Sequence, residues 1–308
     1  MAALVEYDWI PLPVNQTNSG TAALTRHLNP ATTETGIEDR LTVMDGLDRV
    51  RLFGLDLVDA PDLGPVIDEV LSGSRSDDQK LPVVVTPNVD ILVHLDRNPE
   101  TPETQIYERA QYCLPDGQPL IWVSRLIGER LASRLPGSEL FARLWPMVVA
   151  RELPVVLVAS NDVVAQRLQS MHPKAACLVA PVFDKDDADA IGEIVSDVLE
   201  ASRATKPSMV FFGIGNPKDA RIISVLLERW DSEIGAKPLC LGLGGSFLMH
   251  LGMRKRAPAL IQKLGMEWFY RFVQEPRRLF HRYFVQDVWF LNIAWRELQA
   301  SRKTSRSK

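Results

Sequence analysis

The sequence predicts an α/β protein with a Rossmann-like parallel sheet, helices on both faces of the sheet, and a C-terminal helical appendage. Short, continuous apolar runs recur along the chain, as is typical of parallel strands that are buried on both faces. Segments with helical apolar spacing separate these runs, and this alternation favours a parallel sheet covered by helices. After about residue 250 the alternation stops, and the remaining residues predict helices only.

The positions of these runs predict where a functional site lies. Apolar runs predict strands at Arg51–Leu55, Pro82–Thr86, Leu120–Val123, Pro154–Ala159, Ala176–Ala180, Ser208–Phe212 and Pro238–Leu243. Helical apolar spacing predicts helices at Asp62–Leu71, Asp162–Met171, Asp187–Ser202 and Asp219–Trp230. In open sheets of this class, ligands bind beyond the carboxyl ends of the strands. We therefore expect the site in the loops next to the strand ends.

Composition divides the chain into three regions. Residues 1–45 are polar and rich in Thr, Asn and Pro, which predicts a loosely structured leader; residues 46–250 form the core, and residues 251–308 form the appendage. From Arg254 to Lys308 there are 13 Lys/Arg and 4 Asp/Glu, a net charge of +9, whereas the rest carries 22 basic and 35 acidic residues, a net charge of −13. Such asymmetry indicates a basic segment that meets an anionic partner, although a solvated helical face would explain it too.

The appendage also has an apolar pattern. Apolar residues with helical spacing are Phe280, Phe284, Val288, Leu291 and Trp295, and arginines accompany them. This pattern is typical of a basic amphipathic segment that lies on a membrane. The chain contains no run near the roughly 18 apolar residues that span a bilayer, and its first residues do not resemble a signal peptide. We expect a cytoplasmic protein in peripheral contact with an anionic membrane surface.

Several other classes of function find no support in the sequence. The net charge of −4 argues against a nucleic-acid partner. Cys113, Cys177 and Cys240 are widely separated, which predicts neither a zinc site nor a disulfide framework. No serine has the GxSxG setting of a hydrolase. Neither the GxGxxG fingerprint nor the Walker pattern occurs, which argues against an oxidoreductase with this core. We expect no cofactor and no metal, and self-association stays open.

Two candidate polar groups adjoin predicted strands near the middle of the core. Thr86 and Asn88 follow the strand at 82–86 and present short polar side chains that could hold a sugar hydroxyl. Asn88 could instead cap the next helix. Asp116, in Pro115-Asp116-Gly117, precedes the predicted strand at 120–123. Asp-Gly is a common turn dipeptide, but a carboxylate at a sheet edge could also act as a general base.

Glycine-containing loops follow two further predicted strands. The first holds Gly213, Gly215, Asn216 and Lys218 and opens a helix, and the second holds Gly244 and Gly245. Glycine lets the backbone approach a ligand closely, and a helix N-terminus favours an anion such as phosphate. The recurrence of such loops at two strand ends indicates a nucleotide site.

Taken in order, these loops resemble the WecG/TagA/CpsF family of glycosyltransferases. The matching blocks are Thr86-Pro-Asn-Val-Asp90, Leu114-Pro-Asp-Gly117, Pro119-Leu-Ile-Trp-Val123, Arg134-Leu-Pro-Gly-Ser-Glu-Leu140, Phe211-Phe-Gly-Ile-Gly-Asn-Pro-Lys218 and Leu243-Gly-Gly-Ser-Phe247. The most specific block is C-terminal and comprises Arg256-Ala-Pro258, Gly265-Met-Glu-Trp-Phe-Tyr-Arg271, Glu275-Pro-Arg-Arg-Leu279 and Arg282-Tyr283.

The resemblance implies a specific reaction. Members resemble one another in a Rossmann-like core with a C-terminal helical appendage. They transfer a sugar from a UDP-sugar, N-acetylmannosamine in the best-known branches, to a polyprenyl-diphosphate-linked sugar at the inner face of the bacterial plasma membrane. Transfer proceeds with inversion and requires no metal. By resemblance, Asp116 is the base, and Thr86 and Asn88 belong to the substrate pocket. Arg271, Arg278 and Arg282 match arginines that close over the donor diphosphate.

The chain departs from the family pattern at the donor side. Asp219-Ala220 stand where the family has Gln-Glu, Leu248 stands where it usually has Asp, and Ala159-Ser160 replace a glycine pair. The donor sugar is therefore left open between N-acetylmannosamine and another hexose such as glucose. The same departures motivate an alternative function, in which a catalytically degenerate member acts as a scaffold in polysaccharide assembly.

Overall fold

The computed structural model describes residues 47–73, 79–254, 270, 273 and 287–306. All of them belong to one compact unit, Met44–Lys308. The predicted leader and most of the predicted appendage lie outside the described residues.

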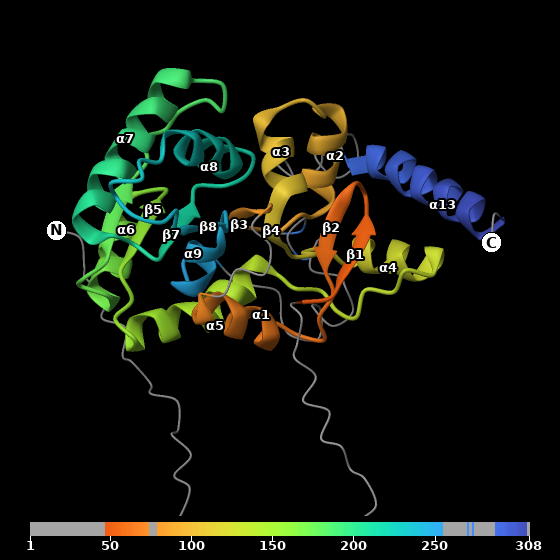
Figure 1. Cartoon of the computed structure of the whole chain (residues 1–308), viewed down its shortest axis with the longest axis horizontal. Helices are drawn as coiled ribbons and strands as arrows, with labels where there is room; N and C mark the ends of the chain where they lie inside the picture. The colour runs from red at the N-terminus through yellow and green to blue at the C-terminus, as the bar shows by residue number, and fades with distance from the viewer. Residues whose placement is uncertain (1–46, 74–78, 255–269, 271–272, 274–286, 307–308) are drawn as a thin grey trace, which may run out of the picture. The chain divides into compact units, whose positions relative to one another are not determined.

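In the described part of the chain, eight strands form one sheet in the order β1-β2-β4-β3-β8-β7-β5-β6 (Figure 1). The strands are β1 (Arg49–Leu52), β2 (Leu55–Val58), β3 (Leu81–Val85), β4 (Ala110–Cys113), β5 (Val155–Ala159), β6 (Ala176–Val179), β7 (Met209–Gly213) and β8 (Leu239–Gly242). The edge strand β1 runs antiparallel to β2, and the other neighbours pair in parallel. The predicted α/β class with a parallel sheet is confirmed.

Helices connect the strands and cover both faces of the sheet. They are α1 (Gly64–Ser72), α2 (Val89–Arg97), α3 (Pro102–Arg109), α4 (Gln118–Ile127), α5 (Gly137–Ala150), α6 (Asp162–Met171), α7 (Ala188–Thr205), α8 (Lys218–Arg229), α9 (Ser246–His250) and α13 (Phe290–Arg306), with a 3₁₀ turn at Asp287–Trp289. In Figure 1, α2, α3, α7 and α8 lie above the sheet, and α1 and α5 lie below it.

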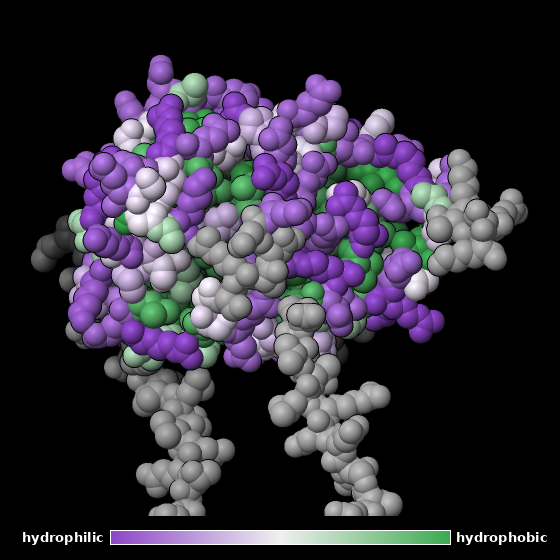
Figure 2. Space-filling model, in the orientation of Figure 1, coloured by the Kyte–Doolittle hydropathy of each residue, from purple (hydrophilic) through white to green (hydrophobic). Residues whose placement is uncertain are grey.

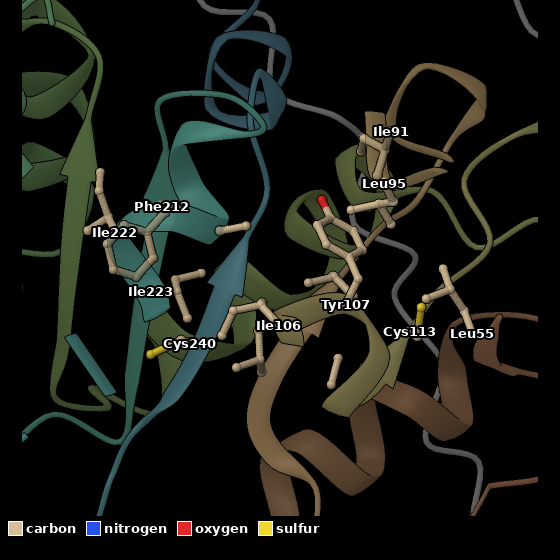
Figure 3. Packing of buried hydrophobic residues seen from close by; sticks show 14 of the residues in the cluster. Leu55, Ile91, Leu95, Ile106, Tyr107, Cys113, Phe212, Ile222, Ile223 and Cys240 are labelled. Carbon is tan, nitrogen blue, oxygen red and sulfur yellow. The ribbon is translucent and has the colours of Figure 1, made fainter. Parts of the chain in front are cut away.

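Each face of the sheet has its own apolar core. One core packs β-strand residues against α2, α3, α7 and α8, with further residues from α4 and α13. Figure 3 shows part of it, in which Tyr107 of α3 lies near Ile106 and faces the α2 residues Ile91 and Leu95. The other core packs the opposite face against α1, α5, α6 and α9. Burial of apolar area on both faces explains why β3, β5, β7 and β8 consist almost entirely of apolar residues.

The predicted strand at Leu120–Val123 is wrong, because these residues lie in α4. Leu120, Ile121 and Val123 are buried while Trp122 is 48% exposed, so the helix has one buried side. A four-residue apolar run does not distinguish a buried strand from one side of a helix. The strand at this place in the sheet is β4, which precedes Asp116 and contains the polar residue Gln111.

The predicted strand at Arg51–Leu55 is a hairpin instead. β1 ends at Leu52 and β2 begins at Leu55. Phe53 and Gly54 form the turn with φ of 56° and 73°. Positive φ at both central residues is the requirement of a type I′ turn, whose twist matches that of antiparallel strands.

The C-terminal helix α13 packs on the core through a side that differs from the predicted apolar stripe. Phe290, Ile293 and Ala294 are buried. The stripe residues Val288, Leu291 and Trp295 are exposed, and Phe280 and Phe284 lie outside the described residues.

Polar contacts fix this helix to α2 and α4. Trp289 Nε1 donates to Asp96 Oδ2 over 2.7 Å, and Arg296 forms an ion pair with the same carboxylate. Ser301 Oγ donates to the carbonyl oxygen of Ile127, at the end of α4, over 3.0 Å. These contacts hold α13 against α2 and α4 and leave the predicted apolar stripe exposed.

Candidate active site

The candidate site lies at the carboxyl edge of the sheet, where the loops after β3, β4, β7 and β8 come together. β3 and β8 are neighbours, with Val84 opposite Leu241. The loops that follow them therefore emerge side by side, and β4 and β7 flank this central pair. Two groups of predicted residues meet here, one after β3 and β4 and the other after β7 and β8.

Asp116 follows strand β4, so its loop leaves the carboxyl edge, whereas the sequence placed it before a strand. Its backbone N–H donates to the carbonyl of Pro87 over 2.9 Å, which ties the β4 loop to the β3 loop. Its Oδ2 accepts from the N–H of Gly137 over 3.2 Å. Gly137 begins the 14-residue helix α5. A helix N-terminus offers backbone N–H groups to a negative side chain, and one of them holds the Asp116 carboxylate in place.

Thr86 and Asn88 lie beside Asp116. Thr86 is buried, and a Cβ at Gly137 would come within 3.0 Å of its Cγ2 and Oγ1. Asn88 Oδ1 accepts from the N–H of Ile91 over 3.1 Å, so Asn88 caps α2, as the second interpretation of its sequence context predicted. The structure thus brings the three predicted residues Thr86, Asn88 and Asp116 together around the N-termini of α2 and α5.

The glycines of the second group allow two loops to touch. A Cβ at Gly213 would lie 2.3 Å from Cδ2 of Phe247, so only glycine fits there without movement of that ring. Gly215 has φ of 123° and Gly244 has φ of 52°, which are positive values that favour glycine. A Cβ at Gly244 would lie 3.6 Å from the Cα of Gly215. The backbones of the loops after β7 and β8 therefore approach each other closely.

Asp219 links these two loops from inside the protein. In the sequence it was only a departure from a family pattern. Its side chain is 0% exposed. Oδ1 accepts from Ile214 N–H over 3.2 Å and from Gly215 N–H over 3.0 Å, and Oδ2 accepts from Gly244 N–H over 2.9 Å. These amides were expected to face a ligand phosphate, but here they face a buried carboxylate. A first-turn acid after a glycine loop is the signal that could have indicated this contact.

Burial raises the pKa of Asp219 from 3.8 to about 6, although the three amide hydrogen bonds oppose the shift. Tyr107 of α3 is a titratable neighbour, and burial and the charge of Asp219 raise its pKa well above 10.0, so it stays neutral.

The raised pKa of Asp219 predicts a pH-dependent stability. Because Asp219 binds its proton more tightly in the folded than in the unfolded state, its contribution to the free energy of unfolding should be greatest below about pH 4 and fall by up to about 3 kcal/mol as pH rises through about 6. Urea unfolding from pH 4 to 7.5 tests this, because Asp219→Asn should flatten the decline. An unchanged profile in the variant would contradict it.

The other predicted residues of the two glycine loops, Lys218, Asn216 and Gly245, lie in different surroundings. Lys218 begins α8, and its Nζ donates to the carbonyl of Phe183 and lies 4.5 Å from the centre of that ring, so it points toward the loop after β6. Asn216 precedes Pro217 in the same glycine loop, through a cis peptide bond. A Cβ at Gly245 would lie 3.6 Å from a guanidinium nitrogen of Arg254, a cation that none of the predicted site motifs includes.

The predicted arginines Arg271, Arg278 and Arg282 lie outside the described residues. Within the described ranges, no group of three or more His, Cys, Asp or Glu side chains has the arrangement of a metal site.

Comparison with known proteins identifies the family. The model of the Glycosyl transferase WecG/TagA/CpsF family matches residues 50–304. A protein of Bacillus spizizenii named N-acetylglucosaminyldiphosphoundecaprenol N-acetyl-beta-D-mannosaminyltransferase is 28% identical over 203 residues, 66% of this chain and 75% of that protein. The protein of that name from Bacillus subtilis is 29% identical over 210 residues, 65% and 75% of the two chains.

The protein of the same name from Staphylococcus aureus is 27% identical over 180 residues, which are 57% of this chain and 66% of that protein. The family model matches most of the chain and spans all the loops of the candidate site, so the resemblance seen in the sequence motifs is confirmed. The chain belongs to the WecG/TagA/CpsF family of glycosyltransferases.

Proposed function

We propose that this glycosyltransferase transfers a sugar from a UDP-sugar to a sugar that is linked to a polyprenyl diphosphate, with inversion at the transferred sugar. The observation that carries the proposal is the position of Asp116, at the N-terminus of α5 and beside Thr86 and Asn88. The names of the relatives support the acceptor, since each names an N-acetylglucosaminyldiphosphoundecaprenol substrate. The family resemblance supports the nucleotide donor.

In the proposed reaction, Asp116 is the catalytic base. An acceptor hydroxyl attacks the anomeric carbon of the donor sugar while the Asp116 carboxylate takes its proton. The bond from that carbon to the diphosphate oxygen breaks, and its electron pair leaves with UDP. Attack and departure on opposite sides of the carbon invert its configuration. Thr86 and Asn88, which line the same edge, would orient the acceptor sugar.

The departing diphosphate gains negative charge, and cationic groups must stabilise it. We assign this role to Arg271, Arg278 and Arg282, because a guanidinium can donate two parallel hydrogen bonds to a phosphate. The net charge of +9 from Arg254 to Lys308 supports an anion-binding role for this part of the chain. In this proposal the arginines stabilise the departing diphosphate without a metal ion.

We further propose that the surface formed by α4 and α13 rests on the inner face of the plasma membrane. Its exposed apolar residues are Trp122 and Leu126 of α4 and Leu291 and Trp295 of α13, and the two helices pack together. Figure 2 shows hydrophobic surface among hydrophilic residues on the side where Figure 1 places these helices. In the part of the chain that the structure describes, no helix is long and apolar enough to cross a membrane.

Substitution of Leu291 and Trp295 by serine should weaken binding to vesicles that contain anionic lipid. Both side chains are more than half exposed, so the variant loses apolar area for the membrane and little packing in the core. Cosedimentation with vesicles measures the effect, and we expect the bound fraction to fall by about tenfold. Met171→Ser, at an exposed apolar residue of α6, is the matched control. Equal binding of both variants would show that this surface does not contact the membrane.

A thermal-shift titration with a panel of UDP- and GDP-sugars separates the proposed function from the scaffold alternative. A nucleotide-sugar that binds the folded state raises the unfolding temperature, and the effective donor should produce the largest rise. The replacement of family residues by Asp219, Ala220 and Leu248 is the observation that favours a degenerate member. Absence of a response to every nucleotide-sugar would favour the scaffold function.

A further inference from the structure

The Asp219 side chain lies between the two glycine loops, here termed loop 213–218 and loop 243–246. It comes from the first turn of α8 and is completely buried. One carboxylate oxygen binds two amides of loop 213–218, and the other binds one amide of loop 243–246. A single side chain therefore joins segments that are about 30 residues apart in the sequence.

Only a side chain with an acceptor oxygen toward each loop can accept from all three of these backbone N–H groups. The three N–H groups converge on one buried position, and a buried amide without a partner is strongly unfavourable. A carboxylate accepts through both oxygens, whereas an asparagine offers one acceptor and would point its own N–H groups at one of the loops. Burial makes charge at this position unfavourable, and the three amide hydrogen bonds offset part of that penalty.

The backbone geometry gives this link a consequence for ligand binding. The backbones of Gly215 and Gly244 approach each other closely, and both have conformations that favour glycine. Loop 243–246 also lies beside the guanidinium of Arg254, whereas Lys218, at the end of loop 213–218, points away toward Phe183. The link through Asp219 thus sets the position of loop 243–246 relative to loop 213–218, at the edge where the donor is proposed to bind.

We propose that Asp219 is a positioning residue that couples loop 213–218 to loop 243–246 and so fixes the shape of the donor side of the site. The coupling of the loops stands on the hydrogen bonds alone, whereas its effect on the donor rests on the proposed function. Asp219 acts through the loops and does not touch the sugar nucleotide.

The experiment compares the full-length protein with Asp219→Asn at pH 7.5 by amide hydrogen exchange. We expect exchange in loop 213–218 and loop 243–246 to rise together by about tenfold, as loss of a buried hydrogen bond predicts. The amides of α7, which packs against the other side of α8, should exchange at the wild-type rate. Unchanged exchange in either loop would refute the coupling, and so would an equal rise throughout the protein.

Asp162→Asn is the matched control. Asp162 also lies in the first turn of a helix that follows a parallel strand, but its side chain is exposed. This variant should leave both loops protected. Asp219→Ser introduces a smaller side chain that leaves room for a water molecule, and it should reproduce the exchange pattern of Asp219→Asn. It provides the same test if Asp219→Asn fails to fold.

A second measurement tests the consequence for the donor. The KM for the donor should rise about tenfold in Asp219→Asn, while kcat and the KM for the acceptor change by less than about threefold. A merely structural loss of folded enzyme would lower the apparent kcat and leave both KM values unchanged. Loosened loops with an unchanged donor KM would refute the effect on the donor. Loosened loops in a protein that transfers no sugar would leave the coupling correct and the proposed function wrong.

Discussion

The Asp116→Asn variant should transfer sugar about 10²–10⁴ times more slowly than the wild type, the range that a positioned general base contributes. Asparagine keeps an oxygen that can accept from the N–H of Gly137, the bond that the carboxylate makes over 3.2 Å. The contact with α5 can therefore survive while the proton acceptor is lost. Initial rates with radiolabelled donor measure the change, and the effect should fall on kcat rather than on the donor KM.

Asp59→Asn is the control for this variant. Asp59 follows β2, the strand beside β4, and is likewise partly buried. Its Oδ1 accepts from the N–H of Ala132 over 2.7 Å, so the same chemical change removes charge from a similar contact outside the site. We expect nearly wild-type transfer. Equal rates for Asp116→Asn and Asp59→Asn would show that Asp116 is a turn residue, the other interpretation of its sequence context.

Gly213→Ala should destabilise the fold and disrupt the donor side of the site. The added Cβ would lie between 2.3 and 2.8 Å from three ring atoms of Phe247. That ring is held by Phe141, whose ring centre lies 4.7 Å away, so it has little room to move. Overpacking of this kind costs about 1–3 kcal/mol. Urea unfolding should show a loss in that range, and donor binding should weaken because loop 213–218 starts at this residue.

Two further variants identify the cause of the loss. Gly192→Ala in α7 adds the same methyl group where the nearest atom is 3.7 Å away, and it should be neutral or slightly stabilising. Phe247→Leu makes room near Gly213, so the double variant should be more stable than the sum of the single losses predicts. Strict additivity of the two losses would show that the clash with Phe247 is not the cause.

Strands of the sheet could be predicted from the sequence wherever their residues form a continuous apolar run. β3, β5, β6, β7 and β8 coincide with continuous apolar runs. β4 could not be found in this way, because Gln111 interrupts its apolar character, and the next apolar run, in α4, took its place. The prediction of Asp116 as a site residue did not depend on this error, since the residue lies at the carboxyl edge in the structure.

The geometry of the candidate-site loops was predictable where a loop carries its own signal. Glycines mark the loops after β7 and β8, and Asn88 occupies a helix-capping position that its neighbours indicate. The bond between Asp219 and Gly244 depends on the pairing of β7 with β8, which a local pattern does not specify. The apolar spacing in α13 was predictable, but which side packs on the core is decided by contacts with α2 and α4.

The most direct test of the proposed function is the mass of the lipid product. Purified protein is incubated with membranes that contain a polyprenyl-diphosphate-linked sugar and, in turn, with each UDP-sugar of a panel, and the lipids are analysed by mass spectrometry. We predict that one donor adds a single sugar residue to the acceptor lipid, and that Asp116→Asn leaves the lipid unchanged. If the protein binds those membranes but the mass of the acceptor lipid stays unchanged with every donor, the result would contradict sugar transfer and favour the scaffold.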